Sequence, residues 1–290
     1  MKKSEFRELV KKPVLLDGAT GSNLTLAGMP KGVCTEMWVL EHADILVELQ
    51  KQYIAAGSQI VYAPTFAANR ISLKAFGLED EVASINTRLV GLSKEAAKGS
   101  DALIAGDVTT TGKFLEPYGD LTYEELLEAY KEQIKVLADA GVDLLVAETM
   151  LGADEVCIFL DAAKAVCDLP LMCSLTVSAD GRTLYGGDMM EAVTTLQQFG
   201  ADAVGINCSV GPDQLEATVR SMAKVATIPI IAKPNAGLPT ITDTGEAVYS
   251  MDAAAFAKSC RALVDAGAGI IGGCCGTKPE YIKALKEMLK

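Results

Sequence analysis

Short apolar runs and helix-patterned segments alternate eight times along this chain of 290 residues. The runs are nearly uninterrupted, as is typical of parallel strands covered on both faces. The predicted strands are 14–17, 59–64, 102–108, 144–149, 171–177, 203–208, 229–234 and 269–274. The predicted helices lie roughly at 43–56, 79–98, 122–140, 154–167, 189–199, 213–226, 252–266 and 279–289. A helix after the last strand favours a closed barrel, so we predict an α/β fold, a single (β/α)8 TIM barrel over residues 1–290.

The helix ends agree with this count. Four helical segments end in a glycine shortly before a strand, and glycine permits the left-handed conformation that closes a helix; these are Gly57, Gly141, Gly200 and Gly267. Segment 18–41 is predicted to be an extended loop after the first strand. An open doubly wound sheet is the alternative, which we disfavour because no G-x-G-x-x-G motif follows any strand.

Charge and histidine content restrict the function. Asp and Glu outnumber Lys and Arg by 38 to 26, so we expect neither a nucleic-acid nor an anionic-membrane surface, since both need clustered basic residues. His42 is the one histidine, which excludes zinc sites built on several histidines and disfavours His-based triads. With no signal peptide and no run of 18 apolar residues, we expect a cytoplasmic protein whose thiols are reduced.

Three of the eight cysteines are predicted to meet at one end of the barrel, where the carboxyl ends of the strands carry the chemistry of such enzymes. Cys274 and Cys275 are adjacent in a glycine run at the end of the eighth strand, and Cys208 ends the sixth. Neighbours in a regular strand point to opposite faces, so both can bind one metal only if the backbone leaves the extended geometry, which the glycines permit.

Three thiolates with an open fourth position form a catalytic zinc arrangement, and we expect one Zn²⁺ per chain. A thiol that enters this position loses its proton, and its electron-rich sulfur is suited to attack a carbon electrophile. The alternative is that cysteines merely fill apolar space. That alternative is favoured for the other five, which are Cys34, Cys157, Cys167, Cys173 and Cys260.

Charged residues end other strands. Asp17 and Glu148 could hold a substrate ammonium, and the amides of 18–21 its carboxylate. The alternatives are a turn-forming role for Asp17 and a salt-bridged position on the rim for Glu148. Lys233 is either a Schiff-base lysine or, as we favour because a proline follows it, a surface or carboxylate-paired lysine.

Four motifs carry a family resemblance. They are Asp-Gly-Ala-Thr-Gly-Ser at 17–22, Gly-Ile-Asn-Cys-Ser-Val-Gly-Pro at 205–212, Pro-Asn-Ala-Gly-Leu-Pro at 234–239 and Gly-Gly-Cys-Cys-Gly-Thr at 272–277. Together they resemble the homocysteine S-methyltransferase family, which includes betaine–homocysteine methyltransferase and the homocysteine-binding domain of cobalamin-dependent methionine synthase. The resemblance runs from about residue 15 to residue 282.

The resemblance implies a zinc ion held by three thiolates, those of Cys208, Cys274 and Cys275. Homocysteine would bind through its sulfur and be methylated to methionine. Asp17, Gly18 and Glu148 match positions that bind the amino-acid end of the substrate in the family. Asn235 matches a position that approaches the zinc when substrate is absent.

The source of the methyl group stays open in the sequence. No D-x-H-x-x-G corrinoid loop is present, because Leu40 stands where the aspartate before His42 would be needed. We expect the donor to be a separate methylcorrinoid protein or methylcobalamin, and the alternative donors are S-methylmethionine and betaine. Further alternatives are one half of a split methionine synthase, a thiol-binding module without turnover of its own, and an enzyme for another thiol or a selenol.

Overall fold

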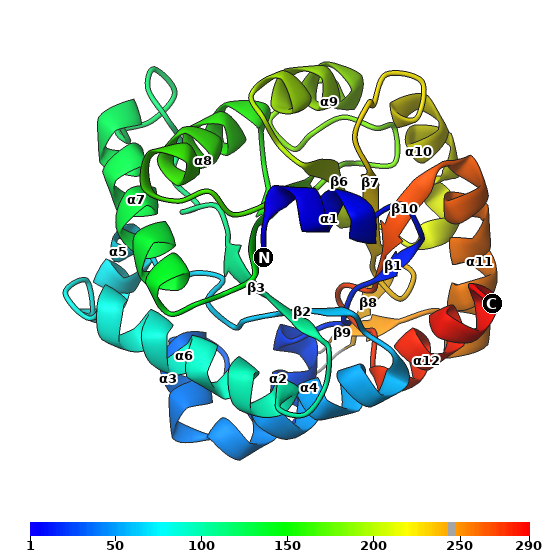
Figure 1. Cartoon of the computed structure of the whole chain (residues 1–290), viewed down its shortest axis with the longest axis horizontal. Helices are drawn as coiled ribbons and strands as arrows, with labels where there is room; N and C mark the ends of the chain where they lie inside the picture. Colours follow the sequence, from blue (N-terminus) through cyan, green and yellow to red (C-terminus); the bar gives the residue numbers. More distant parts are fainter. Residues whose placement is uncertain (243–246) are drawn as a thin grey trace.

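Eight parallel strands form the centre of the computed structural model, which describes residues 1–242 and 247–290. They are β1 (Val14–Leu15), β2 (Ile60–Tyr62), β3 (Leu103–Val108), β4 (Leu144–Met150), β5 (Leu171–Leu175), β6 (Ala203–Cys208), β7 (Ile230–Pro234) and β10 (Ala268–Ile271). Their order is β1-β10-β7-β6-β5-β4-β3-β2, and a parallel bridge between Leu16 and Ile60 joins β1 to β2. The predicted barrel is confirmed (Figure 1).

The helices form a ring outside the barrel (Figure 1). They are α4 (Ala43–Ala56), α6 (Val82–Ala97), α7 (Tyr123–Asp139), α8 (Ala153–Val166), α9 (Met189–Gln198), α10 (Glu216–Met222), α11 (Ala253–Ala266) and α12 (Pro279–Met288). Each matches a predicted helix, and α10 is shorter than predicted because a 3-10 turn, Pro212–Gln214, precedes it. The four predicted helix-ending glycines all have positive φ, between 78° and 123°.

Several connections are more ordered than predicted. Segment 18–41 is not an extended loop, because it contains α2 (Gly21–Leu26) and α3 (Thr35–Glu41). Leu24, Trp38 and Val39 of these short helices pack in a cluster with residues of α4 and α6. The prediction failed because each helix spans only about two turns, too few for a clear periodic pattern.

Further elements were not predicted. They are α1 (Lys3–Leu9), α5 (Arg70–Leu73) with the 3-10 turn Lys74–Phe76, and a hairpin of β8 (Pro239–Ile241) and β9 (Ala247–Tyr249). The hairpin follows β7 and is largely exposed, so it lacks the apolar alternation of a core strand. Short exposed elements of this kind leave little periodic signal in a sequence.

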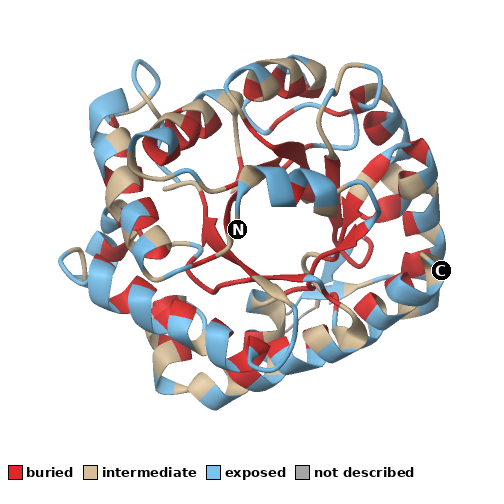
Figure 2. Cartoon of the chain, in the orientation of Figure 1, coloured by how far each residue is buried: buried red, intermediate tan, exposed pale blue. Residues whose placement is uncertain are grey.

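Side chains of the strands alternate between two apolar cores. In β4, for example, Leu144 and Val146 face an inner core while Leu145 and Ala147 face the helices. The inner core takes residues from every barrel strand and includes Phe6, which is fully buried. Helix α1 thus closes the amino-terminal end of the barrel, the end nearest the viewer in Figure 1. Figure 2 shows the buried residues on the strands and on the inward sides of the helices.

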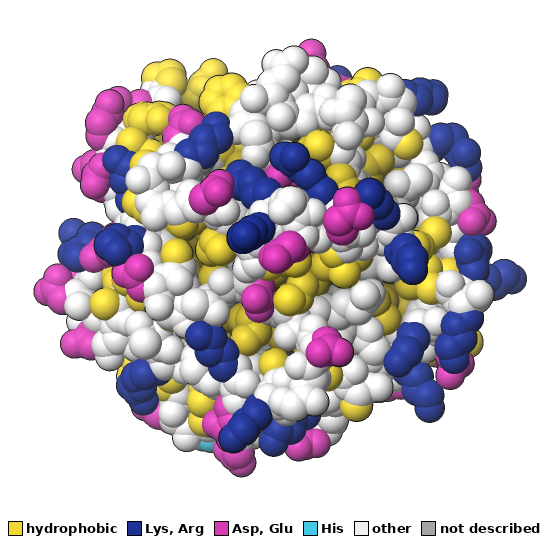
Figure 3. Space-filling model, viewed as in Figure 1, with side chains coloured by type: hydrophobic (Ala, Val, Ile, Leu, Met, Phe, Trp, Pro, Cys, Tyr) yellow, Lys and Arg dark blue, Asp and Glu magenta, His cyan; other side chains and the backbone are white. Residues whose placement is uncertain are grey.

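The surface at this end is mixed in charge. Figure 3 shows basic side chains interspersed with acidic ones on this face. None of the helices in residues 1–242 and 247–290 combines the length and apolar character needed to cross a membrane.

Candidate active site

Polar side chains form the upper layer of the barrel interior. The inward alternation of β3, β4 and β7 ends in Asp107, Glu148 and Lys233, each two residues beyond an inward-facing apolar residue. All three are at most 7% exposed. They lie at the carboxyl ends of their strands, the end at which (β/α)8 enzymes carry their active sites.

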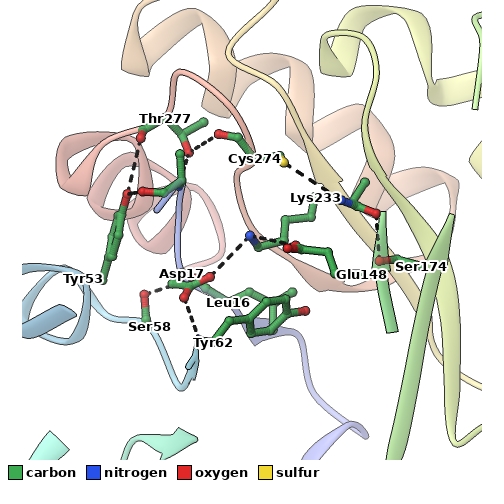
Figure 4. Close-up of polar contacts among 12 residues, drawn as sticks. Leu16, Asp17, Tyr53, Ser58, Tyr62, Glu148, Ser174, Lys233, Cys274 and Thr277 are labelled. Carbon is green, nitrogen blue, oxygen red and sulfur yellow. Dashed lines mark hydrogen bonds and ion pairs between the residues drawn. The ribbon is translucent and has the colours of Figure 1, made fainter. Parts of the chain in front are cut away.

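A buried ion cluster occupies this layer. The Nζ atom of Lys233 lies 3.4 Å from Oδ1 of Asp17 and 3.1 Å from Oε1 of Glu148, as Figure 4 shows. It also lies 4.8 Å from the ring centroid of Tyr62, whose backbone N–H donates a 2.8 Å hydrogen bond to Asp17 Oδ2. Lys233 is therefore carboxylate-paired, as we favoured, and not on the surface. Glu148 is buried rather than on the rim, and Asp17 is buried as well.

Burial and charge set the protonation of this cluster. Burial raises the pKa of Asp17 to about 6, although the charge of Lys233 opposes the rise. Burial and the charge of Glu148 hold the pKa of Asp107 well above its usual value. Burial opposes the charge of Lys233, but Glu148 and Asp17 outweigh it and raise its pKa well above the usual value. These shifts favour the ammonium form of Lys233 and the protonated form of Asp107.

The three predicted thiols meet at the same mouth. The Sγ atoms of Cys208, Cys274 and Cys275 all lie within 4.8 Å of one another, and those of Cys208 and Cys275 are 3.9 Å apart. Tetrahedral zinc with Zn–S bonds of about 2.3 Å needs sulfur atoms about 3.8 Å apart, so donor type and spacing fit this metal. The thiols are partly exposed, which leaves them accessible to a substrate.

Hydrogen bonds to two neighbouring segments shape the turn that carries Cys274 and Cys275. Strand β10 ends at Ile271, so the prediction of a strand through residue 274 was wrong. The N–H of Gly273 donates to Asp17 O, and that of Cys274 to Pro234 O, at 3.0 and 2.7 Å. The backbone thus leaves the extended geometry, as the shared ligation of adjacent cysteines requires.

Asn235 lies beside this turn. Its neighbour Ala236 donates its N–H to Cys275 O at 2.9 Å, and Asn235 itself is 3% exposed. Its Oδ1 atom is buried without a hydrogen-bond partner. An unpartnered buried oxygen on a residue beside this turn is a candidate for a further polar contact to a ligand.

Asn207 connects the thiols to the end of β4, a role that the sequence reasoning missed. Its Oδ1 accepts from Thr149 N (2.9 Å) and Ser174 Oγ (2.8 Å), and its Nδ2 donates to Thr149 Oγ1 (2.6 Å). Nδ2 also lies 3.9 Å from Cys274 Sγ. Thr149 and Cys208 have positive φ, 58° and 60°, a conformation costly for residues other than glycine. The signal available in the sequence was the inward alternation of β6, which ends at Asn207.

The thiols are protonated at neutral pH in the absence of a cation. The pKa of Cys208 is raised to about 11, because the hydrogen bond from Cys274 lowers it less than Cys275 and burial raise it. The pKa of Cys275 is raised to about 12, since Cys274 and burial outweigh the lowering by the Cys208 contact. A metal that binds here therefore displaces protons.

The remaining predicted residues have packing roles. A Cβ atom on Gly18 would lie 2.6 Å from the ring of Tyr53, whose hydroxyl donates to Ala19 O at 2.7 Å. The close approach of the Tyr53 ring to the backbone therefore requires glycine at position 18, independently of any ligand that the Gly18 amide binds. The other five cysteines are free and lie apart from the thiol group, either buried or partly buried.

Fold and site together define a (β/α)8 barrel with a three-thiol centre and a buried ion cluster at one mouth. A family model described as "Homocysteine S-methyltransferase" matches residues 14–289, and the chain belongs to this family. The family resemblance expected from the sequence is thereby confirmed.

Known proteins similar to this chain agree. Methionine synthases of Mycobacterium leprae (strain TN) and Mycobacterium tuberculosis (strain ATCC 25618 / H37Rv) are 26% and 27% identical over 95% and 92% of the chain. The chain spans about a quarter of their length, 24% in each. The metallated form of the homocysteine methyltransferase MmuM from Escherichia coli superposes with a TM-score of 0.79 at 22% identity, over 97% of this chain and 99% of that one. Its oxidised form gives 0.80 at 24% identity, over 97% and 98%.

Proposed function

We propose that this protein methylates the thiol of homocysteine to form methionine, with residues 1–290 acting as one domain. The observation that carries the proposal is the convergence of three cysteine thiols and a buried Asp17–Lys233–Glu148 cluster at one mouth of the barrel. A thiol-bearing amino acid has the two groups that such a pair of features would recognise. Family membership supports the same acceptor.

We propose one Zn²⁺ per chain, held by Cys208, Cys274 and Cys275. When bound, this ion lowers the pKa of a ligated thiol, so that a thiolate is available at neutral pH. Oδ1 of Asn235 is unpartnered, and the next residue is hydrogen-bonded to the turn that carries Cys275, which supports a contact to the metal when substrate is absent.

The amino-acid end of homocysteine is assigned to the other half of the site. Asp17 and Glu148 offer buried carboxylate oxygens to its ammonium, and the backbone amide of Gly18 is assigned to its carboxylate. Binding at both ends fixes the sulfur near the thiols, which reduces the entropy lost on reaching the transition state. In the reaction the sulfur lone pair forms the new C–S bond, the donor keeps the electron pair of the broken bond, and the thiol proton passes to solvent.

The proposed donor is a separate methylcorrinoid protein, or methylcobalamin. Exposed apolar side chains from the loops after β2, β3, β5 and β7 suit a docking partner; they are Phe66, Phe114, Leu184 and Leu238, 36–58% exposed. The resemblance of the motifs to the homocysteine-binding domain of cobalamin-dependent methionine synthase supports this donor. S-methylmethionine and betaine are the alternative donors. All eight cysteines are free, which suits the reducing cytoplasm.

A parallel assay tests this function. Zinc-loaded protein is incubated with homocysteine and either methylcobalamin, S-methylmethionine or betaine, and methionine is quantified. We expect methionine with methylcobalamin, and none with Cys275→Ala. Methionine from a small donor alone would overturn the corrinoid assignment. Homocysteine binding without turnover from any of the three donors would instead favour a thiol-binding module.

A further inference from the structure

The buried ion cluster is one positive charge short. Three carboxyl groups, those of Asp17, Asp107 and Glu148, surround the single ammonium of Lys233, and all four side chains are buried. If Asp107 is protonated, the charges of Asp17 and Glu148 still exceed that of Lys233 by one. A buried charge without a partner is costly, so the cluster favours a second cation.

Three carboxyl oxygen atoms in the cluster are poorly satisfied, and one of them is Asp107 Oδ1, which has no hydrogen-bond partner. Asp17 Oδ1 and Glu148 Oε1 have no hydrogen-bond partner, although each lies within ion-pair distance of Lys233 Nζ. Buried carboxylate oxygens in proteins almost always accept a hydrogen bond. Both atoms therefore retain the capacity to accept from an N–H group of a ligand.

We propose that Lys233 is a positioning residue that holds Asp17 and Glu148 as a charged pair one cation short, so that the site selects thiols carrying an ammonium group. This proposal rests on the proposed function and names the residue that sets its selectivity for the amino-acid end. The ammonium of the substrate would neutralise the cluster, whereas a thiol without it would leave the charge uncompensated.

The surroundings of Lys233 suit this role. Its Nζ contacts both carboxylates and the ring of Tyr62, and Asp107 of β3 and Cys274 of the β10 turn also act on it electrostatically. With the side chain only 5% exposed, the ammonium is largely shielded from solvent. A Schiff-base lysine needs a neutral amine, which this environment disfavours.

Removal of Lys233 should have a specific consequence. Two like charges buried near each other, without the lysine between them, cannot both stay ionised. One carboxyl then takes up a proton, so the ammonium of the substrate meets one charged carboxylate instead of two and is bound less tightly.

The test compares homocysteine with 4-mercaptobutyrate, which is the same thiol acid without the amino group. Calorimetry gives the dissociation constant of each for the zinc-loaded parent protein, Lys233→Met and Lys233→Arg. We expect the parent to prefer homocysteine. The preference should fall at least about tenfold in Lys233→Met, the loss of one charge-assisted contact, and partly recover in Lys233→Arg. An unchanged preference in Lys233→Met with zinc retained would overturn the proposal.

A double variant distinguishes the proposed role of Lys233 from a general loss of folding in Lys233→Met. Lys233→Met should lower the Tm, and Lys233→Met/Glu148→Gln should restore it, because the double variant removes one charge of each sign. The restored protein should still have the reduced preference for homocysteine, because it too offers the substrate ammonium one carboxylate, that of Asp17, instead of two. Recovery of that preference, or a Tm no higher than that of Lys233→Met, would contradict the charge argument. These binding measurements need no methyl donor. Their outcome therefore tests the role of Lys233 even if the protein fails to transfer a methyl group.

Discussion

The two ends of the barrel use the same alternation of strand residues for different purposes. At the amino-terminal end the inward side chains are apolar, and Phe6 of α1 closes the core with no exposed surface. At the carboxyl end the inward positions carry Asp107, Glu148 and Lys233. The non-glycine residues with positive φ in the described ranges, Thr149, Cys208 and Ser209, also lie at that end.

This difference teaches that stability and chemistry are separated along the barrel axis. The lower layers gain free energy from buried apolar surface, while the upper layer contains unpaired oxygens and strained backbone. Such features are costly, and proteins keep them where function depends on them. Substitutions at the two ends should therefore have opposite signatures.

The largest expected effect is the loss of the metal centre. Cys275→Ala removes one of three thiolates, so zinc should fall from about one ion per chain to near zero and methionine formation to background. Elemental analysis and circular dichroism of the purified protein measure metal and fold. Cys157→Ala, which removes a partly buried cysteine outside the three-thiol group, is the matched control. Stoichiometric zinc in Cys275→Ala would refute the ligand assignment.

The opposite end should respond in stability alone. Phe6→Ala opens a cavity in the inner core and should lower the free energy of unfolding by about 3–5 kcal/mol. Urea denaturation followed by circular dichroism measures this change. The KM for homocysteine should stay within about twofold of the value for the parent protein, because the substitution leaves the substrate-binding end of the barrel intact. A large increase in KM would show that the two ends are coupled.

Substitution of Asn207 tests whether the strained backbone at the carboxyl end of the barrel supports the metal site. Asn207→Ala removes the hydrogen bonds that hold Thr149 and approach Cys274, and zinc affinity should fall by about 10–100-fold, as for other supporting residues of metal sites. Competition with a chromophoric chelator measures it. Ser174→Ala, which removes one bond to Asn207, should lose less. Equal losses of zinc affinity in the two variants would show that Asn207 does not support the metal site.

The smallest effect concerns Asp17, whose pKa is about 6 in the folded protein against 3.8 ordinarily. Because folding raises this pKa, the group contributes stability below pH 3.8 that is lost as pH rises through 6. Asp17→Asn should therefore raise the Tm at pH 7 by roughly 2–4 °C, about 1 kcal/mol, and the gain should shrink toward pH 5. Scanning calorimetry across this range measures the difference. A Tm that falls at pH 7 would contradict the account.

The sequence predicted the barrel because its periodic signals are local. It predicted the three thiols because Cys208 ends one barrel strand and the Cys274–Cys275 pair follows shortly after another. It did not predict where β10 ends, since the glycines at 272 and 273 are compatible with strand or turn. The burial of Lys233 also escaped prediction, because it depends on carboxylates from β1 and β4 that are distant in sequence. Segment 18–41 was missed because its helices gain their stability from tertiary packing.

X-ray absorption at the zinc edge tests the central claim most directly. Without substrate, the protein should show three sulfur ligands and one lighter atom. Added homocysteine should replace the lighter atom by a fourth sulfur, while 4-mercaptobutyrate at the same concentration should do so incompletely. A spectrum that homocysteine leaves unchanged, or a zinc ion with fewer than three sulfur ligands, would contradict the assignment of this mouth of the barrel as the thiol-activating site.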